Sequence, residues 1–382
     1  MSKKIVAVLD VGSSSIKAVV SERGVNNTFS IKSEVAVPYE GFAEGQFFDL
    51  QELSDAISDA VMGAFEKAGK KFKEIYVGVP GVFVEIENKK IKNSFGKQKK
   101  VRQADIDELF ERGKKFAQKE GYQVVSATER NFVLDESRIV ENPVGVVSSI
   151  IAAPVTYILC ENYFIDTISK ILNGLGISEI NYVYSGHSEG RYLIEREERE
   201  TPSIIIDVGY ITSDISIHHG NSIIAKSSCD FGGGMLTFTI VQGFDLMPDI
   251  AEDLKRKVNL GYSSDENEVY TVATENGVVE LSTYEVNEKI VECVDTYVGD
   301  VCEFLESKKG IIGEEYQLYL TGGGISYLKG IKTYFLTRFG LPVEILSPKV
   351  PFFNKPSESS KFALLDYALK EKEKKSKQFF IF

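Results

Sequence analysis

Two segments of this chain carry the same pattern, and their repetition restricts the fold more than any other feature. Residues 4–24 (KIVAVLDVGSSSIKAVVSERG) and 203–220 (SIIIDVGYITSDISIHHG) each begin with an apolar, β-branched run that ends in Asp-Val-Gly. Each continues through a turn that contains hydroxyl side chains into a second β-rich run. Both segments predict a β-hairpin with an Asp beside a tight turn. A chain that builds this hairpin twice is expected to contain two similar lobes.

Composition and charge narrow the classes of protein. The length of 382 residues is sufficient for two or three domains, and the 43% of hydrophobic residues is ordinary for a soluble globular protein. The net charge of −12 repels nucleic acid, so no nucleic-acid partner is expected. Four cysteines without metal-ligand spacing indicate reduced thiols: Cys160, Cys229, Cys293 and Cys302. No apolar run approaches the roughly 20 residues of a membrane span, so membrane contact is expected to be peripheral.

The order of predicted elements divides the chain into lobes and insertions. Three strands, a helix over residues 50–69 and a buried strand open the chain. Residues 82–160 differ in character, with alternating strands and a polar helix at 103–121, and predict a small α/β subdomain. We expect a first-lobe core at 1–81 with 161–200 and 341–382, an inserted subdomain at 82–160, a second-lobe core at 201–235 with 311–340, a second-lobe subdomain at 236–310 and a basic and aromatic tail at 370–382.

The repeated turns have the chemistry of a phosphate site. Gly12 and Gly209 let backbone N–H groups point outward, where such groups bind phosphate oxygens, and Lys17 adds a cation. Asp10 and Asp207 could hold Mg²⁺ through water, because this ion retains much of its hydration. The residues expected to surround the phosphates are Gly12, Ser13, Ser14, Ser15, Lys17, Gly209, Tyr210, Ile211 and Thr212.

A third glycine-rich element lies near the end of the second lobe. The segment YLTGGGISYLKG, residues 319–330, predicts a buried strand that delivers Gly322, Gly323 and Gly324 to the start of a helix. Three adjacent glycines permit close approach of a flat ring or a phosphate. After two phosphate hairpins, this turn is expected to hold adenosine.

These elements resemble the two phosphate motifs and the adenosine motif of the actin-like ATPase superfamily, and the chain is similar to its FtsA family over nearly its whole length. Residues 142–160 resemble the end of that family's inserted subdomain, of SHS2 type. The resemblance implies an α/β, actin-like two-lobe fold of duplicated ribonuclease-H-like βββαβα units. It also implies nucleotide contacts by Gly232, Gly233 and Gly234, and by Glu252 and Lys255, which share one helix face.

The same resemblance implies a function in bacterial division. The implied protein is an ATP-binding, self-polymerising scaffold of the septum that binds the C-terminal peptide of FtsZ, tethers the FtsZ ring and recruits later division proteins. It would be cytoplasmic and peripheral on the inner leaflet of the cell membrane at the division site, with ATP and Mg²⁺ as cofactors. A PilM-like pilus-assembly ATPase and a small-molecule kinase on the same fold remain alternatives.

Departures from the superfamily pattern put hydrolysis in question more than binding. Tyr210 and Ile211 occupy places where the superfamily often has glycine, so at most a weak ATPase is expected. Asp10, Asp207 and Glu189 are the candidate catalytic residues, and Glu189 could orient a water near Mg²⁺ or serve a structural role. His218 and His219 are expected to be exposed at a strand end.

The C-terminus carries the candidate membrane contact. Beyond Leu369, lysines and glutamates precede Phe379-Phe380-Ile381-Phe382. FtsA-like proteins end in an amphipathic membrane helix, and a frayed basic tail is the alternative. The residues assigned to the membrane are Lys374, Lys375, Lys377, Phe379, Phe380, Ile381 and Phe382.

Overall fold

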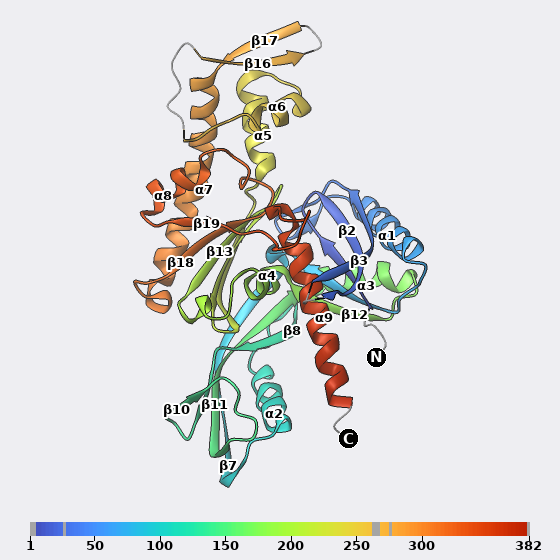
Figure 1. The fold of residues 1–382 in the computed structure, drawn as a ribbon, viewed down its shortest axis with the longest axis vertical. Coiled ribbons are helices and arrows are strands. Elements are labelled where there is room, and N and C mark those ends of the chain that lie inside the picture. Colours follow the sequence, from blue (N-terminus) through green and yellow to red (C-terminus); the bar gives the residue numbers. More distant parts are fainter. Residues whose placement is uncertain (1–4, 26–27, 262–267, 275–276, 380–382) are drawn as a thin grey trace.

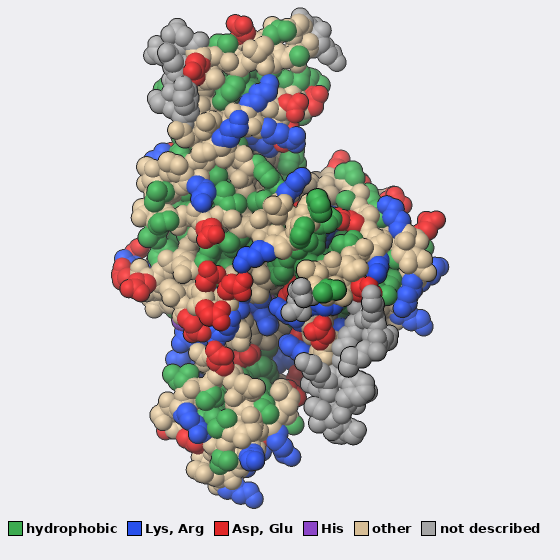
Figure 2. Space-filling model, in the orientation of Figure 1, with side chains coloured by type: hydrophobic (Ala, Val, Ile, Leu, Met, Phe, Trp, Pro, Cys, Tyr) green, Lys and Arg blue, Asp and Glu red, His purple; other side chains and the backbone are tan. Residues whose placement is uncertain are grey.

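Two five-stranded sheets and a long insertion organise the computed structural model (Figure 1). The structure describes residues 5–25, 28–261, 268–274 and 277–379. The inserted subdomain forms one end of the elongated molecule. The other end is a helical subdomain with a ribbon of two strands, β16 (Val269–Thr274) and β17 (Gly277–Ser282). On the face in Figure 2, basic side chains are interspersed with acidic ones. Among the described residues, no helix is both long enough and apolar enough to cross a membrane.

The first-lobe sheet has the strand order β12-β6-β1-β2-β3. Strands β1, β2 and β3 pair with one another in antiparallel fashion, whereas β6 and β12 run parallel to β1. Helix α1 begins behind Asp49, whose carboxylate accepts the N–H groups of Gln51 and Glu52, and it buries a stripe that includes Leu53 and Ile57. The elements are β1 (Ile5–Val11), β2 (Ser15–Arg23), β3 (Phe29–Pro38), β4 (Phe42–Ala43), β5 (Gln46–Phe47), α1 (Leu50–Lys67), β6 (Glu74–Val79), α3 (Asn162–Gly174), β12 (Glu179–Tyr184) and α4 (Ser185–Leu193).

The second-lobe sheet repeats this topology as β15-β14-β13-β18-β19. Here too three antiparallel strands are followed by two parallel ones, which confirms the predicted duplication. Strand β19 lies beyond residue 340, so the second-lobe core extends past the boundary expected from sequence. The strands are β13 (Ser203–Val208), β14 (Ser213–His219), β15 (Ser222–Cys229), β18 (Gln317–Thr321) and β19 (Val343–Ile345).

The inserted subdomain is a third sheet that contacts both lobes. Its strands are ordered β10-β9-β11-β7, with β8 also paired to β11, and α2 packs against β7. Its first residues are fixed to the second lobe by Lys226, whose Nζ donates to the carbonyls of Gly81 (2.5 Å) and Val84 (2.8 Å). The elements are η2 (Gly81–Phe83), β7 (Val84–Lys100), α2 (Gln103–Lys114), β8 (Tyr122–Glu129), β9 (Phe132–Leu134), β10 (Arg138–Val140) and β11 (Val147–Glu161).

Helices dominate the second-lobe subdomain and the C-terminal part of the chain. The 30-residue helix α7 buries Ile290, Val294, Val298 and Val301 along one face. Helix α9 runs without interruption from the cavity between the lobes into the basic tail. The elements are η3 (Glu198–Glu200), α5 (Gly233–Phe244), α6 (Pro248–Lys255), β16 (Val269–Thr274), β17 (Gly277–Ser282), α7 (Thr283–Ile312), α8 (Ile331–Phe339), η4 (Pro356–Glu358) and α9 (Ser359–Phe379).

The triple glycine does not open a helix, contrary to the expectation from sequence. Residues 322–330 form bends and turns, and α8 begins only at Ile331. Gly330 has a φ of 80°, which interrupts a right-handed helix, and a Cβ there would lie 2.1 Å from the amide nitrogen of Gly261. The N–H of Leu260 donates to the carbonyl of Lys329 (2.7 Å), so close contact with the chain after α6 fixes this conformation.

His218 is buried, whereas the sequence suggested an exposed strand end. Its ring lies against Gly190 of α4, and its Nε2 is 2.9 Å from Ser216 Oγ. Burial, and then the nearby Arg199 guanidinium, lower the pKa of His218 from 6.5 to about 3.

The buried imidazole predicts a loss of stability in acid. The unfolded chain takes up a proton near pH 6.5 that the folded chain takes up only near pH 3. The free energy of unfolding should therefore fall as the pH falls through this interval. In His218→Asn, unfolding between these pH values should take up one proton fewer, so the free energy of unfolding should change less steeply with pH. Urea denaturation at a series of pH values measures this slope. An unchanged slope would contradict the buried neutral state.

Candidate functional site

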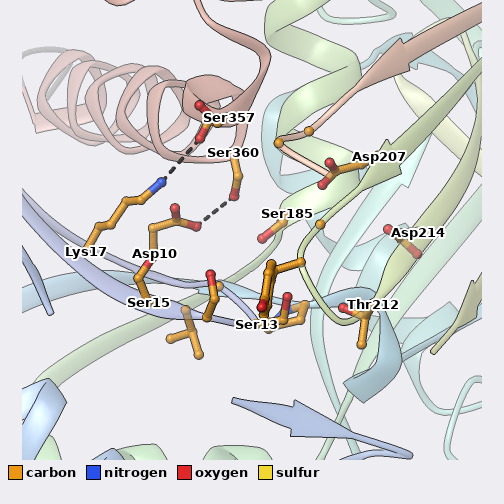
Figure 3. A pocket seen from close by; sticks show the side chains of 18 of the residues that line it. Asp10, Ser13, Ser15, Lys17, Ser185, Asp207, Thr212, Asp214, Ser357 and Ser360 are labelled. Atoms are coloured by element: carbon orange, nitrogen blue, oxygen red, sulfur yellow. Dashed lines mark hydrogen bonds between the residues drawn. The ribbon is translucent and has the colours of Figure 1, made fainter. Parts of the chain in front are cut away.

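A cavity of about 470 Å³ lies between the two lobes, and both repeated hairpins open onto it (Figure 3). Its walls come from the two hairpin turns, helix α4, the glycine turn after β18, helix α6 and the start of α9. Most of its lining residues are polar.

The two hairpin turns have equivalent geometry. Gly12 N–H donates to the carbonyl of Ser15 (3.1 Å), and Gly209 N–H donates to that of Thr212 (2.9 Å). The backbone N–H of Ile211 donates to Ser13 Oγ (3.1 Å), which joins the turns across the lobes. The duplicated segments thus meet at the cavity.

The repeat is chemically asymmetric at one position. Asp10 pairs with Lys17 across the first hairpin, whereas Asp207 pairs with Asp214 across the second. The first hairpin therefore supplies a cation to the cavity, and the second supplies an additional carboxylate. Asp214 accepts hydrogen bonds from Tyr184 (2.5 Å) and Ser228 (2.7 Å).

Four carboxyl groups lie close to one another at the cavity: Asp10, Glu189, Asp207 and Asp214. Burial, followed by the charges of Asp214 and Asp10, raises the pKa of Asp207 to about 7, and Lys17 opposes the shift. Burial also raises the pKa of Glu189 well above its usual value, with further contributions from Asp207, Asp214 and Asp10. A bound cation would relieve this repulsion.

Glu189 is an unusual member of this group. Its side chain is 1% exposed and lies on the cavity wall, and neither carboxylate oxygen has a hydrogen-bond partner within the described chain. Buried polar atoms rarely lack a partner, so this side chain is available to a water or ligand in the cavity.

Close backbone contacts hold the glycine-rich turns together. Gly233 N–H donates to the carbonyl of Gly209 (2.9 Å), and Gly324 N–H donates to that of Val208 (2.7 Å). A Cβ on Gly324 would lie 2.2 Å from the Gly209 carbonyl oxygen, and one on Gly232 would lie 2.3 Å from that of Tyr210. Glycine is therefore required for packing at these positions.

Of the predicted pair on α6, Glu252 lines the cavity, whereas Lys255 lies behind its wall. The buried ammonium of Lys255 donates to Glu252 Oε2 (2.6 Å), to Thr237 Oγ1 (3.0 Å) and to the carbonyl of Gly233 (2.9 Å). Lys255 thus orients Glu252 and fixes the glycine turn. The exposed cation on this side of the cavity is Arg256, which the sequence analysis did not single out.

Most of the predicted site residues reach the cavity. The lining includes Asp10, Gly12, Ser13, Ser14, Ser15, Lys17, Glu189, Asp207, Gly209, Tyr210, Thr212, Glu252, Gly322 and Gly323. Six predicted residues lie outside the lining: Ile211, Gly232, Gly233, Gly234, Lys255 and Gly324. Lining residues that the sequence analysis missed include Ser185, Asp214, Arg256, Pro356, Ser357 and Ser360.

Four of the predicted membrane residues lie in the last turns of α9. Lys374 is exposed and forms an ion pair with Glu371 (2.7 Å). Lys375, Lys377 and Phe379 are helical positions whose side chains are not described, and Phe380, Ile381 and Phe382 lie outside the described residues.

The residues present fit a nucleotide with Mg²⁺. Backbone amides, serine hydroxyls and Lys17 are suitable donors for phosphate oxygens, and Asp10 and Asp207 are suitable partners for a hydrated cation. The described residues contain no group of three or more His, Cys, Asp or Glu that could hold a metal by itself. Water and phosphate oxygens would have to complete the coordination.

Two family models match this chain. The model for cell division protein FtsA matches residues 204–365, and that for the SHS2 domain inserted in FtsA matches residues 81–159. FtsA of Neisseria meningitidis serogroup B is 23% identical over 359 residues, which cover 91% of this chain and 84% of that protein. Both models describe FtsA, and together they match most of this chain. FtsA of Escherichia coli K12 is 22% identical over 253 residues, 66% of this chain, and the match spans only 60% of the E. coli protein.

Solved structures establish the actin-like fold. One chain of the PilM–PilN type IV pilus biogenesis complex aligns with TM-score 0.64 and 14% identity, over 95% of this chain and 98% of that chain. MreB5 of Spiroplasma citri bound to AMPPNP aligns with TM-score 0.57 and 12% identity over 98% of each chain. The MamK double helical filament aligns with TM-score 0.53 and 12% identity over 97% and 98%, respectively.

Proposed function

We propose that this chain binds Mg-ATP between its lobes and acts as an actin-like scaffold of the division septum. The observation that carries this proposal is the convergence of two equivalent hairpin turns, Lys17 and paired carboxylates on one interlobe cavity. The matches to the FtsA family models support the division role. The AMPPNP-bound and filamentous proteins of the same fold support nucleotide binding and self-association.

The direct test is titration with a fluorescent ATP analogue in the presence and absence of Mg²⁺. Saturable, Mg²⁺-dependent binding is expected, and ATP should compete. Gly323→Val should weaken binding, because Gly323 lines the cavity and its Cβ position is only 3.1 Å from Ser357 Cβ. Stimulation of turnover by a sugar or acetate would instead favour a kinase, and failure to bind ATP would overturn the proposal.

Any hydrolysis should depend on Glu189. Its buried carboxyl lines the cavity near Asp10 and Asp207, where it could orient a water. Tyr210 lines the cavity and is 45% exposed. We therefore expect slow turnover that Glu189→Gln decreases at least tenfold while ATP affinity changes little.

The proposed scaffold binds a C-terminal peptide of FtsZ through the second-lobe subdomain. Lys289 and Lys309 are about half exposed on α7, where each also lies near a glutamate, and Lys308 lies over Phe304 of the same helix. These side chains are available to an acidic peptide. Fluorescence anisotropy with a labelled peptide and the full chain should show saturable binding. Lack of binding at high micromolar concentration would favour a pilus-type role.

We propose that the C-terminal tail contacts the inner leaflet of the cytoplasmic membrane. The protein would then lie at the division site and recruit later division proteins. Each lysine near an anionic membrane contributes up to about 1 kcal/mol, reduced here by glutamates. A single weak anchor gives marginal binding, whereas a polymer that presents many tails gains roughly 10² to 10⁴ in avidity. Pelleting on anionic vesicles should therefore require ATP and weaken with salt. Truncation after Ser376 should abolish it, and equal pelleting of the truncated chain would exclude the tail as anchor.

A further inference from the structure

A short segment before and within the first turn of α9 forms a wall of the interlobe cavity. This bridging segment, Pro356–Ser360, comprises η4 and the start of α9, and three of its residues line the cavity. Ser360 Oγ donates to Asp10 Oδ1 (2.7 Å), and Lys17 Nζ donates to the carbonyl of Ser357 (3.2 Å), as Figure 3 shows. The segment therefore holds the two charged groups of the first hairpin.

The bridging segment is also bonded to the second lobe. Thr321 Oγ1, at the end of β18, lies 2.7 Å from Ser359 Oγ in a buried contact. The hydroxyl of Tyr327 lies 2.9 Å from Ser357 Oγ. Five consecutive residues thus connect the first hairpin with the glycine turn of the other lobe.

These contacts leave Asp10 and Lys17 able to bind a ligand. An ionised carboxylate has about four acceptor sites and an ammonium has three donors, and the bridging segment uses one of each. A side chain held in place before a ligand arrives loses less entropy on binding. The contacts should therefore favour binding.

We propose that Ser360 is a positioning residue that orients Asp10 for a hydrated cation, and that nucleotide occupancy is thereby linked to the attachment of α9. This inference rests on the proposed function. Linkage is reciprocal: if the Ser360–Asp10 contact strengthens Mg-ATP binding by some factor, bound Mg-ATP strengthens that contact by the same factor.

The remainder of α9 is attached to the first lobe along much of its length. Leu364, Leu365 and Ala368 are buried against the first-lobe sheet. Arg23 of β2 pairs with Asp366 (3.2 Å), and Lys372 pairs with Glu74 of β6 (2.7 Å). The continuous helix extends this attachment from the cavity to the basic tail.

The test compares Ser360→Ala and Ser360→Thr with a control, Ser58→Ala in α1. The Ser58 hydroxyl donates to the carbonyl of Ser54 in the same helix. We expect Ser360→Ala to weaken Mg-ATP binding about tenfold, as for loss of a hydrogen bond to a charged group, and Ser360→Thr to retain most of it. Without Mg²⁺ the variants should bind ATP equally, because Ser360 acts through the cation-facing carboxylate. A general structural defect would weaken binding in both conditions.

Hydrogen exchange supplies an independent readout. In wild type, saturating Mg-ATP should slow exchange of the amides at 361–374 by about the same tenfold factor, and Ser360→Ala should lose this protection. Failure of wild type to bind Mg-ATP would overturn the proposed function. Binding with unchanged exchange in α9, or an unchanged affinity of Ser360→Ala, would overturn this inference alone.

Discussion

Replacing Gly324 with alanine is expected to lower the free energy of unfolding by about 3 kcal/mol and to abolish nucleotide binding. The added Cβ would lie 2.2 Å from the Gly209 carbonyl oxygen and 2.9 Å from the Gly233 amide nitrogen. Both neighbours are backbone atoms of turns that are hydrogen-bonded to each other, so neither can move alone. The clash should separate the glycine turn after β18 from the second hairpin turn.

Gly299 provides the matched control. It lies within α7, and a Cβ there would meet nothing within 4 Å. Gly299→Ala should raise the free energy of unfolding by about 0.5–1 kcal/mol, because alanine loses less backbone entropy in a helix. Urea denaturation measures both variants. Similar stabilities of the Gly324 and Gly299 variants would contradict the close packing of the turns.

Asp207→Asn is expected to have opposite effects on stability and on Mg-ATP binding. The pKa of Asp207 is about 7 in the folded chain and near 3.8 when unfolded, so wild type should lose stability as the pH rises from about 4 to 7. Asparagine removes this loss and the repulsion from Asp214 and Asp10. At pH 8 the variant should therefore be more stable, by a few kcal/mol in order of magnitude.

The same substitution removes a proposed anchor of the hydrated cation. We expect Mg-ATP affinity to fall about 10- to 100-fold, while ATP binding without Mg²⁺ improves or stays unchanged. Denaturation at pH 5 and pH 8, combined with nucleotide titration, separates the two effects. If Asp207→Asn were less stable than wild type at pH 8, the proposed repulsion of Asp207 by Asp214 and Asp10 would be contradicted.

Local patterns made the two hairpins predictable, and the resemblance that these hairpins carry implied the actin-like fold. In each hairpin an apolar strand, Asp, Gly and a polar turn are contiguous, and the two turns proved equivalent down to their closing hydrogen bonds. Helix α1 was likewise predictable, because the apolar residues that it buries recur with helical spacing in its own sequence. Each of these features depends on contacts within about 30 residues.

Features that depend on distant contacts were missed. Ser360 bonds to Asp10 across 350 positions, and its surrounding sequence has no glycine turn or charge pattern that marks a ligand site. The sequence showed that Glu252 and Lys255 share one helix face. It did not show that tertiary packing directs Glu252 toward the cavity and Lys255 toward the Gly233 carbonyl. Likewise, contact with Gly261 decides that Gly330 interrupts the helix expected after the glycine turn.

A crystal structure with Mg²⁺ and a non-hydrolysable ATP analogue tests the central claim most directly. The account predicts phosphate oxygens between the turns that contain Gly12 and Gly209, the cation facing Asp10 and Asp207, and the base near Glu252. Electron density for the nucleotide outside this cavity, or contact with only one hairpin, would contradict it.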